Sequence, residues 1–168
     1  MTEKEITGFT KKIRNRVMGL IFDDEDRILL IKHKHLLLDN EYFLLPPGGG
    51  VEFGETLFEA LKREISEETN LNITKANYQF MNEFIEGPYH AIEHFFHVEN
   101  YNGNPVMGTD PELPEYNQMI LGLEWYSEIE LLNIKSYRKH KIFNIEGDFE
   151  KLKTISQLTT VVSNQKNS

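Results

Sequence analysis

The chain has 168 residues, of which 39% are hydrophobic and 11% aromatic, enough to bury one ordinary core. The formal net charge of −9 argues against nonspecific nucleic-acid binding, because binding to phosphate backbones needs a surface of Lys and Arg. The absence of cysteine excludes disulfides, a thiolate nucleophile and zinc–thiolate sites.

Three short apolar runs predict the first strands. Residues 17–22 and 28–31 flank an acidic turn at 23–26, so these two runs are expected to form a hairpin. Residues 42–45 are the third run, and the sequence Pro-Pro-Gly-Gly-Gly of residues 46–50 stops it. Proline removes hydrogen-bond donors and glycine permits left-handed dihedrals, so a shaped loop is expected there.

The clearest helix is expected between Thr56 and Asn70. Thr56 and Glu59 have the spacing of a capping box at a helix start. Three apolar residues then recur at helical spacing, namely Leu57, Leu61 and Ile65. Asn70 tolerates the left-handed conformation that ends many helices, so the helix is predicted to stop there.

The rest of the chain predicts strands at 78–85, 91–101 and 120–126, and a helix over 148–162. Residues 101–114 are rich in turn formers, and a loop of this length in a compact domain is often functional. Strands on both sides of a central helix, with a terminal helix, predict an α+β fold in which a mixed sheet lies between helices, an α/β/α sandwich. We expect one domain over residues 1–168, with residues 1–13 and 164–168 as loose termini.

Three carboxylates share one face of the predicted central helix. Glu64, Glu67 and Glu68 are spaced i, i+3 and i+4 and fall within an arc of about 100°. Like charges at this spacing repel one another, and Arg63 is placed to relieve only Glu67. Either this face is solvated or it holds a cation, and hard divalent ions such as Mg²⁺ prefer oxygen ligands.

Taken together, residues 49–71 resemble the Nudix box. The matching positions are Gly49, Glu55, Arg63, Glu64, Ile65, Glu67, Glu68 and Leu71. Asn70 stands where the family has Gly, and Asn can adopt the same left-handed conformation. The strand that ends in residues 46–50, and the sequence Glu-Trp-Tyr-Ser of 124–127 before an acidic stretch, also look like the family, so the resemblance extends over roughly residues 15–132.

The resemblance implies a Nudix-like fold and a metal-dependent hydrolase that cleaves a diphosphate linkage by water attack at phosphorus. It implies that Mg²⁺ or Mn²⁺ is bound by Glu64, Glu67 and Glu68 and by a backbone carbonyl near Gly49. Arg63 would orient these carboxylates, and Glu55 would tie the loop to the helix. The glycine-rich turn would let the backbone approach the substrate closely, through Gly48, Gly49 and Gly50.

The general base is left open by the resemblance. In some members it corresponds to Glu64, and in others it comes from a loop before the strand that carries Trp. Here that loop offers Asp110, Glu112 and Glu115, and we favour Glu112. The candidates for catalysis are therefore Glu64, Glu67, Arg63 and Glu112.

The resemblance implies that the substrate is a nucleoside diphosphate linked to another moiety. It does not rank ADP-ribose, dinucleoside polyphosphates, nucleoside triphosphates and nucleotide sugars. Family subgroups differ at a residue shortly after the box, where proline goes with ADP-ribose and tyrosine with dinucleoside polyphosphates. This chain has Gly87-Pro88-Tyr89 there, so the cue points both ways, and Gly-Pro can simply make a turn. Tyr89 is a candidate for stacking on a base.

Two other classes compete with the enzyme. A nucleotide-sensing module with a Nudix-like fold would be expected to lack one of the three glutamates, and all are present. An interaction protein with an acidic surface would leave the glycine loop unexplained. No apolar run approaches the roughly 18 residues of a membrane span, and residues 1–12 do not read as a signal peptide. We therefore expect a cytoplasmic protein with a small-molecule partner and no nucleic acid or membrane partner. The sequence does not determine the oligomeric state, and a homodimer is one option because dimers are common in such families.

Overall fold

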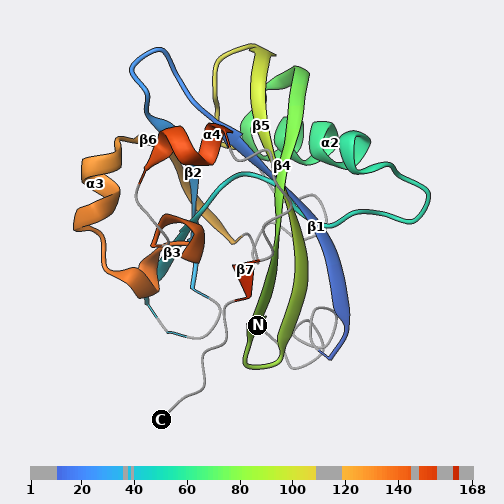
Figure 1. The fold of residues 1–168 in the computed structure, drawn as a ribbon, viewed down its shortest axis with the longest axis vertical. Coiled ribbons are helices and arrows are strands. Elements are labelled where there is room, and N and C mark those ends of the chain that lie inside the picture. The colour runs from blue at the N-terminus through green and yellow to red at the C-terminus, as the bar shows by residue number, and fades with distance from the viewer. Residues whose placement is uncertain are drawn as a thin grey trace.

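The computed structural model of the chain describes residues 11–35, 38, 40–108, 119–144, 148–154 and 161–162. Its elements, shown in Figure 1, are β1 (Ile13–Ile21), β2 (Ile28–Lys34), β3 (Tyr42–Leu45), α2 (Leu57–Thr69), β4 (Asn72–Glu86), β5 (Tyr89–Asn102), β6 (Ile120–Tyr126), α3 (Glu128–Asn133), two 3₁₀ turns, η2 (Ser136–Arg138) and η3 (Lys141–Phe143), α4 (Phe149–Thr154) and β7 (Val161–Val162). Among the described helices, none has the length and apolar character needed to cross a membrane.

The strands form two sheets. In the first, the order is β1-β5-β4-β7, and β5 pairs parallel with β1 and antiparallel with β4. In the second, the order is β3-β2-β6, and both pairings are antiparallel. Parallel and antiparallel neighbours in one sheet make it mixed, as the sequence predicts.

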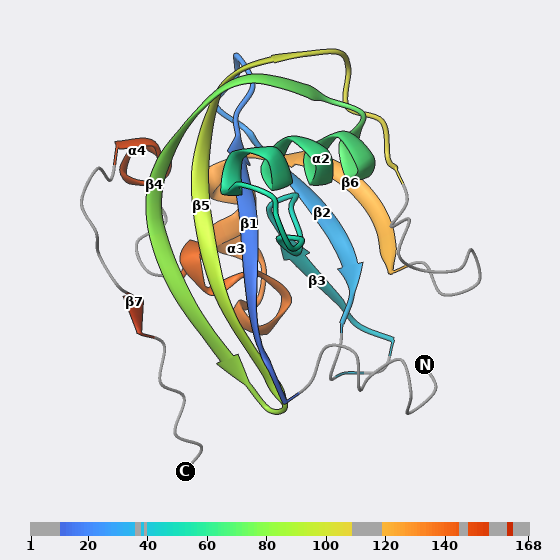
Figure 2. The same ribbon diagram turned by 90° about the vertical axis from the view of Figure 1, so that its right-hand side faces the viewer.

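Helices cover the strands on both sides. One core cluster joins α2 to alternate residues of β1, such as Val17 and Ile21. A second cluster joins the intervening residues, such as Met18 and Leu20, to α3, η3 and α4. Because successive side chains of a strand point to opposite faces, the strands lie as a layer between α2 and the C-terminal helices (Figure 2). The α/β/α architecture is thereby confirmed.

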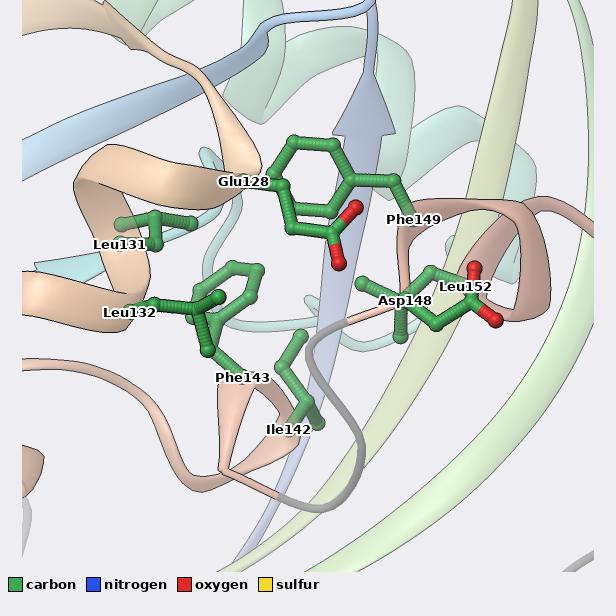
Figure 3. Close-up of a pocket in the computed structure, with 8 residues that line it drawn as sticks. All are labelled: Glu128, Leu131, Leu132, Ile142, Phe143, Asp148, Phe149 and Leu152. Carbon is green, nitrogen blue, oxygen red and sulfur yellow. The ribbon is translucent and has the colours of Figure 1, made fainter.

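A shallow apolar crevice lies on the C-terminal side of this layer (Figure 3). Leucine, isoleucine and phenylalanine side chains line it, with two carboxylates, and the full set is Glu128, Leu131, Leu132, Ile142, Phe143, Asp148, Phe149 and Leu152. All of them come from α3, η3, α4 or the residue before α4, so none belongs to the acidic helix.

The predicted hairpin of residues 17–22 and 28–31 is wrong. The two runs touch through one isolated bridge, between Phe22 and Ile28, and belong to different sheets. Both runs are buried along nearly their whole length. Each strand is therefore covered on both faces and takes its hydrogen-bonding partners from distant parts of the chain.

The predicted C-terminal helix is too long. Helix α4 ends at Thr154, and Val161–Val162 instead pair with Asn82 and Glu83 as a short parallel strand. β-branched residues favour the pleated surface of a sheet edge over a helix. The predicted strands 78–85, 91–101 and 120–126 are confirmed within β4, β5 and β6.

The central helix begins and ends where the sequence predicts. Thr56 is the N-cap and forms the full capping box with Glu59. Asn70 is the C-cap, with φ of 60°, and its N–H donates to the carbonyl of Ser66. These two ends fix the register in which the helix presents its acidic face.

Candidate active site

Arg63 contacts both the glycine loop (residues 46–50) and the acidic face of α2, which is the face that carries Glu64, Glu67 and Glu68. Its Nε and Nη2 donate to the two oxygens of Glu55 at 2.8 and 3.0 Å, and Nη2 also donates to the carbonyl of Gly50 at 2.9 Å. Its Nη1 lies 3.0 Å from Glu64 Oε1 and 3.3 Å from Glu67 Oε2. One guanidinium therefore ties the glycine loop to two of the three predicted metal ligands.

Glu55 is held ionised by this contact. The hydrogen bond from Arg63 holds the pKa of Glu55 well below its usual range, and the N–H of Glu52 adds a further hydrogen bond. Glu55 therefore connects Arg63 of α2 to the turn that follows the glycine loop.

The side chain of Glu64 is more buried than that of Glu67, at 13% against 30% exposed. Burial raises the pKa of Glu64 to about 6, although the charge and hydrogen bond of Arg63 act in the opposite direction. A Cβ at Gly49 would lie 2.3 Å from Glu64 Oε2, so the carboxylate packs directly on the backbone of the glycine loop. The sequence pattern predicts no salt bridge to Glu64, and the contact from the adjacent Arg63 was missed because adjacent residues do not share a helix face.

Glu68, one helical turn after Glu64 on α2, also contacts the glycine loop. The N–H of Gly48 donates to Glu68 Oε2 at 2.7 Å. The carbonyl of Gly49 accepts from the N–H of Val17 at 2.9 Å, and Gly19 donates to the carbonyl of Pro47 at 2.8 Å. The glycine loop is therefore held between β1 on one side and two glutamates of α2 on the other.

The donor set suits a hard divalent cation, because it consists of carboxylate oxygens beside a backbone carbonyl. One oxygen of Glu64 and one oxygen of Glu67 both contact the same atom, Arg63 Nη1, so these two carboxylates converge on one point. Among the described residues, no three acidic or histidine side chains converge into a ready-made coordination shell. Glu68 Oε2 accepts a hydrogen bond from the N–H of Gly48.

Two further predicted site residues, Tyr89 and Glu112, are not found beside the acidic face in the described part of the chain. Tyr89 starts β5 and pairs with Glu86 at the β4–β5 turn, which lies at the far end of the sheet from α2 (Figure 2). The structure does not bring Tyr89 beside the acidic face. Glu112, with Asp110 and Glu115, lies outside the described residues.

The segment before the loop that carries Glu112 is described, and it lies against the end of α2. Gly108 donates its N–H to the carbonyl of Glu68 at 2.8 Å, and Val106 donates to the carbonyl of Thr69 at 2.9 Å. A Cβ at Gly108 would lie 1.8 Å from the carbonyl oxygen of Glu67. The described chain therefore reaches the backbone of the last turn of α2 at Gly108.

A second polar cluster was not found from the sequence. Glu93, Asn82 and His140 are all buried, and both Asn82 Nδ2 and His140 Nε2 lie within hydrogen-bonding distance of Glu93 Oε2. Arg16 lies on the other side of the carboxylate, with Nη1 3.5 Å from Oε1. The signal available was Glu93 itself, an acidic residue that alternates with Ala91 and Phe95 on the buried face of β5. Its partners come from β1, β4 and the N-cap of η3, and no sequence spacing links them.

Comparison with known proteins gives a family match and similar folds. The NUDIX domain family matches residues 12–144, well over half of the chain. A NUDIX hydrolase from Nitrosomonas europaea has a TM-score of 0.66 at 19% identity, covering 88% of this chain and 93% of that one. A MutT NUDIX hydrolase from Burkholderia pseudomallei has a TM-score of 0.58 at 24% identity, with 71% and 87% covered.

A MutT protein from Methanosarcina mazei Go1 has a TM-score of 0.59 at 21% identity, with 74% of this chain and 84% of that one covered. At these identities the structural likeness shows the fold alone. Among curated proteins, no significant match is found.

Proposed function

Because the chain belongs to the Nudix hydrolase family, we propose that it is a Mg²⁺- or Mn²⁺-dependent pyrophosphohydrolase acting on a nucleoside diphosphate linked to another moiety. The observation that carries the proposal is the set of hydrogen bonds made by Arg63. Its guanidinium donates to Glu64, to Glu67 and to the carbonyl of Gly50 in the glycine loop. A solvated acidic helix face would need no such network. The network supports a site that must keep several like charges in fixed positions.

Each residue of the site has a proposed task. Arg63 orients the carboxylates, and Glu55 in turn fixes Arg63 through two hydrogen bonds. Gly48 lets the loop backbone approach β1 and Gly49 lets it approach Glu64 of α2, because a Cβ at either position would collide. We propose that both also let the backbone approach the substrate closely. A bound divalent ion would neutralise charge on the diphosphate and lower the pKa of the attacking water.

We propose that Glu64, Glu67 and Glu68 hold the ion, together with the carbonyl of Gly49. The proton acceptor is proposed to be Glu112, with Glu64 as the alternative. The start of the Glu112 loop at Gly108, beside the backbone of Glu68, supports the first choice. Tyr89 stays a candidate for base stacking, although its place at the β4–β5 turn does not favour it.

A hydrolysis screen tests the function. ADP-ribose, a dinucleoside polyphosphate, a nucleoside triphosphate and a nucleotide sugar are each incubated with the protein in Mg²⁺, in Mn²⁺ and in a chelator. We expect metal-dependent release of a nucleoside monophosphate or an equivalent phosphate product from at least one of them. Binding without product release would favour the nucleotide-sensing alternative instead.

The variant Glu68→Gln tests the metal assignment. The amide can still accept the hydrogen bond from Gly48 but carries no charge. Loss of an outer-shell partner of a metal typically costs 10–100-fold, so loss of a ligand should lower kcat/KM by about 100-fold or more. Glu25→Gln, a change at the exposed turn between β1 and β2, is the matched control. Full activity in Glu68→Gln would remove Glu68 from the ligand set.

A further inference from the structure

A buried carboxylate anchors the polar cluster on the face of β1 and β5 opposite α2. Glu93 is 1% exposed, and its Oε2 accepts hydrogen bonds from Asn82 Nδ2 and His140 Nε2, both at 2.9 Å. The N–H of Ile142 donates to His140 Nδ1, so the proton of His140 that faces Glu93 is on Nε2. Two buried groups thus fix one oxygen of Glu93 and leave Oε1 for Arg16.

The contact with Glu93 involves only one nitrogen of the Arg16 guanidinium, Nη1. Its Nη1 lies 3.5 Å from Glu93 Oε1, whereas Arg63 binds Glu55 through two hydrogen bonds at 2.8 and 3.0 Å. Arg16 Nε is buried and has no hydrogen-bond partner among the described residues. A buried donor without an acceptor is unfavourable in a folded protein, so the protein itself does not hold the guanidinium of Arg16 with a full set of hydrogen bonds.

The position of Arg16 links it to the candidate active site. Its backbone forms a bridge with Gly50, and the next residue, Val17, donates to the carbonyl of Gly49. Gly49 in turn contacts the carboxylate of Glu64. The glycine loop is therefore flanked by acidic groups of α2 on one side and by Arg16 on the other.

A diphosphate is the ligand class that suits this position. Phosphate oxygens accept several hydrogen bonds, and the planar fork of arginine matches their geometry. The chain carries a net charge of −9, so an anionic substrate needs specific positive groups near the site. The side chain of Arg16 is 22% exposed, which lets a ligand reach it without moving the cluster behind it.

We propose that Arg16 binds a phosphate group of the substrate and that Glu93 is a positioning residue, which holds Arg16 in place through the hydrogen bonds of Asn82 and His140. The ligand class rests on the proposed function. The cluster also explains why an ionised carboxylate is kept in the core, because an arginine anchored on one side presents its remaining donors in a fixed direction.

Binding of α,β-methylene-ADP tests the proposal, because its carbon bridge resists hydrolysis and the measurement does not depend on turnover. Isothermal titration calorimetry is carried out in Mg²⁺ on the native protein, Arg16→Gln and Arg16→Lys. A hydrogen bond to a charged group corresponds to a loss of about 10- to 100-fold in affinity for Arg16→Gln. Arg16→Lys, which keeps the charge without the fork, should lose less.

Arg27→Gln is the matched control, because Arg27 pairs with Asp23 at the turn between β1 and β2. Mn²⁺ binding, followed by electron paramagnetic resonance, should be unchanged in Arg16→Gln, since Arg16 contacts the phosphate and not the ion. Glu93→Gln should weaken analogue binding, and its effect should not add to that of Arg16→Gln in a double-mutant cycle.

The outcomes separate this proposal from the proposed function. Native affinity for the analogue in folded Arg16→Gln and Arg16→Lys overturns the assignment of Arg16, even if the native protein hydrolyses nucleotides. Absence of analogue binding to the native protein also overturns it. Binding that depends on Arg16, without metal-dependent hydrolysis, would support the phosphate contact and reject the proposed enzyme.

Discussion

Two neighbouring glycines in the loop before α2 are constrained by different atoms. A Cβ at Gly48 would lie 2.0 Å from the backbone oxygen of Val17, and φ at Gly48 is +144°. A Cβ at Gly49 would lie 2.3 Å from Oε2 of Glu64, which is the movable end of a side chain. The first contact constrains the fold, whereas the second constrains the position of one acidic group.

Alanine at these two positions should therefore give opposite results. Gly48→Ala should destabilise the protein by about 1–3 kcal/mol, as expected for a residue forced into a sparsely populated backbone region. Gly49→Ala should keep most of the stability but lose activity and Mn²⁺ affinity, because the methyl group displaces the Glu64 carboxylate. Urea unfolding and Mn²⁺ titration measure the two effects. The same loss of stability in both variants would contradict this distinction.

At the scale of the element, the two ends of α2 are set by local chemistry. The capping box at Thr56 and the left-handed Asn70 were both predicted from neighbouring residues, because their partners lie within four positions along the chain. The same holds for the contact of Arg63 with Glu67, which follows from i, i+4 spacing. Local signals were therefore sufficient to predict the acidic face.

The C-cap allows a test of the one departure from the Nudix box. Asn70 has φ of 60°, a region that costs a residue with a Cβ atom roughly 1–2 kcal/mol and that glycine visits freely. Asn70→Ala should therefore be less stable than Asn70→Gly by about 1 kcal/mol, with activity retained in both. Thermal and urea unfolding of the two variants measure the difference. Equal stability would show that the helix can end without the left-handed residue.

Strand pairing could not be predicted in the same way. The two apolar runs that form β1 and β2 are adjacent in sequence and are joined by an acidic turn at residues 23–26. Nevertheless, β1 pairs with β5, and β2 pairs with β3 and β6. Hydrophobic pattern shows that a strand is buried but does not show which strand lies beside it. A fully buried run also has no polar face that would fix its orientation.

At the scale of the whole molecule, the same limit applies to the site. Arg16 and Glu93 are paired across a parallel register, and His140 joins them from a 3₁₀ turn 47 residues further along the chain. Such a cluster depends on the packing of β1, β4, β5 and η3 together. The sequence predicts the helix that carries the carboxylates, whereas only the fold brings the positive group to the other side of the glycine loop.

The acid sensitivity of the folded protein tests how strongly this cluster is held. Burial raises the pKa of Glu93, but the hydrogen bonds from His140 and Asn82 and the charge of Arg16 together lower it below the ordinary value of 4.5. A carboxyl with a lower pKa in the folded protein adds stability at pH values above its unfolded pKa. That contribution is lost as the pH falls through the folded pKa.

The free energy of unfolding should therefore decrease as the pH drops below about 4.5. Glu93→Gln should flatten this part of the curve, because an amide binds no proton there, although the variant should be less stable than the native protein near neutral pH. Urea unfolding at steps from about pH 6 to pH 3 gives the slope for each protein. If Glu93→Gln kept the native slope, the acid sensitivity would belong to other carboxylates, and the cluster would contribute little to stability.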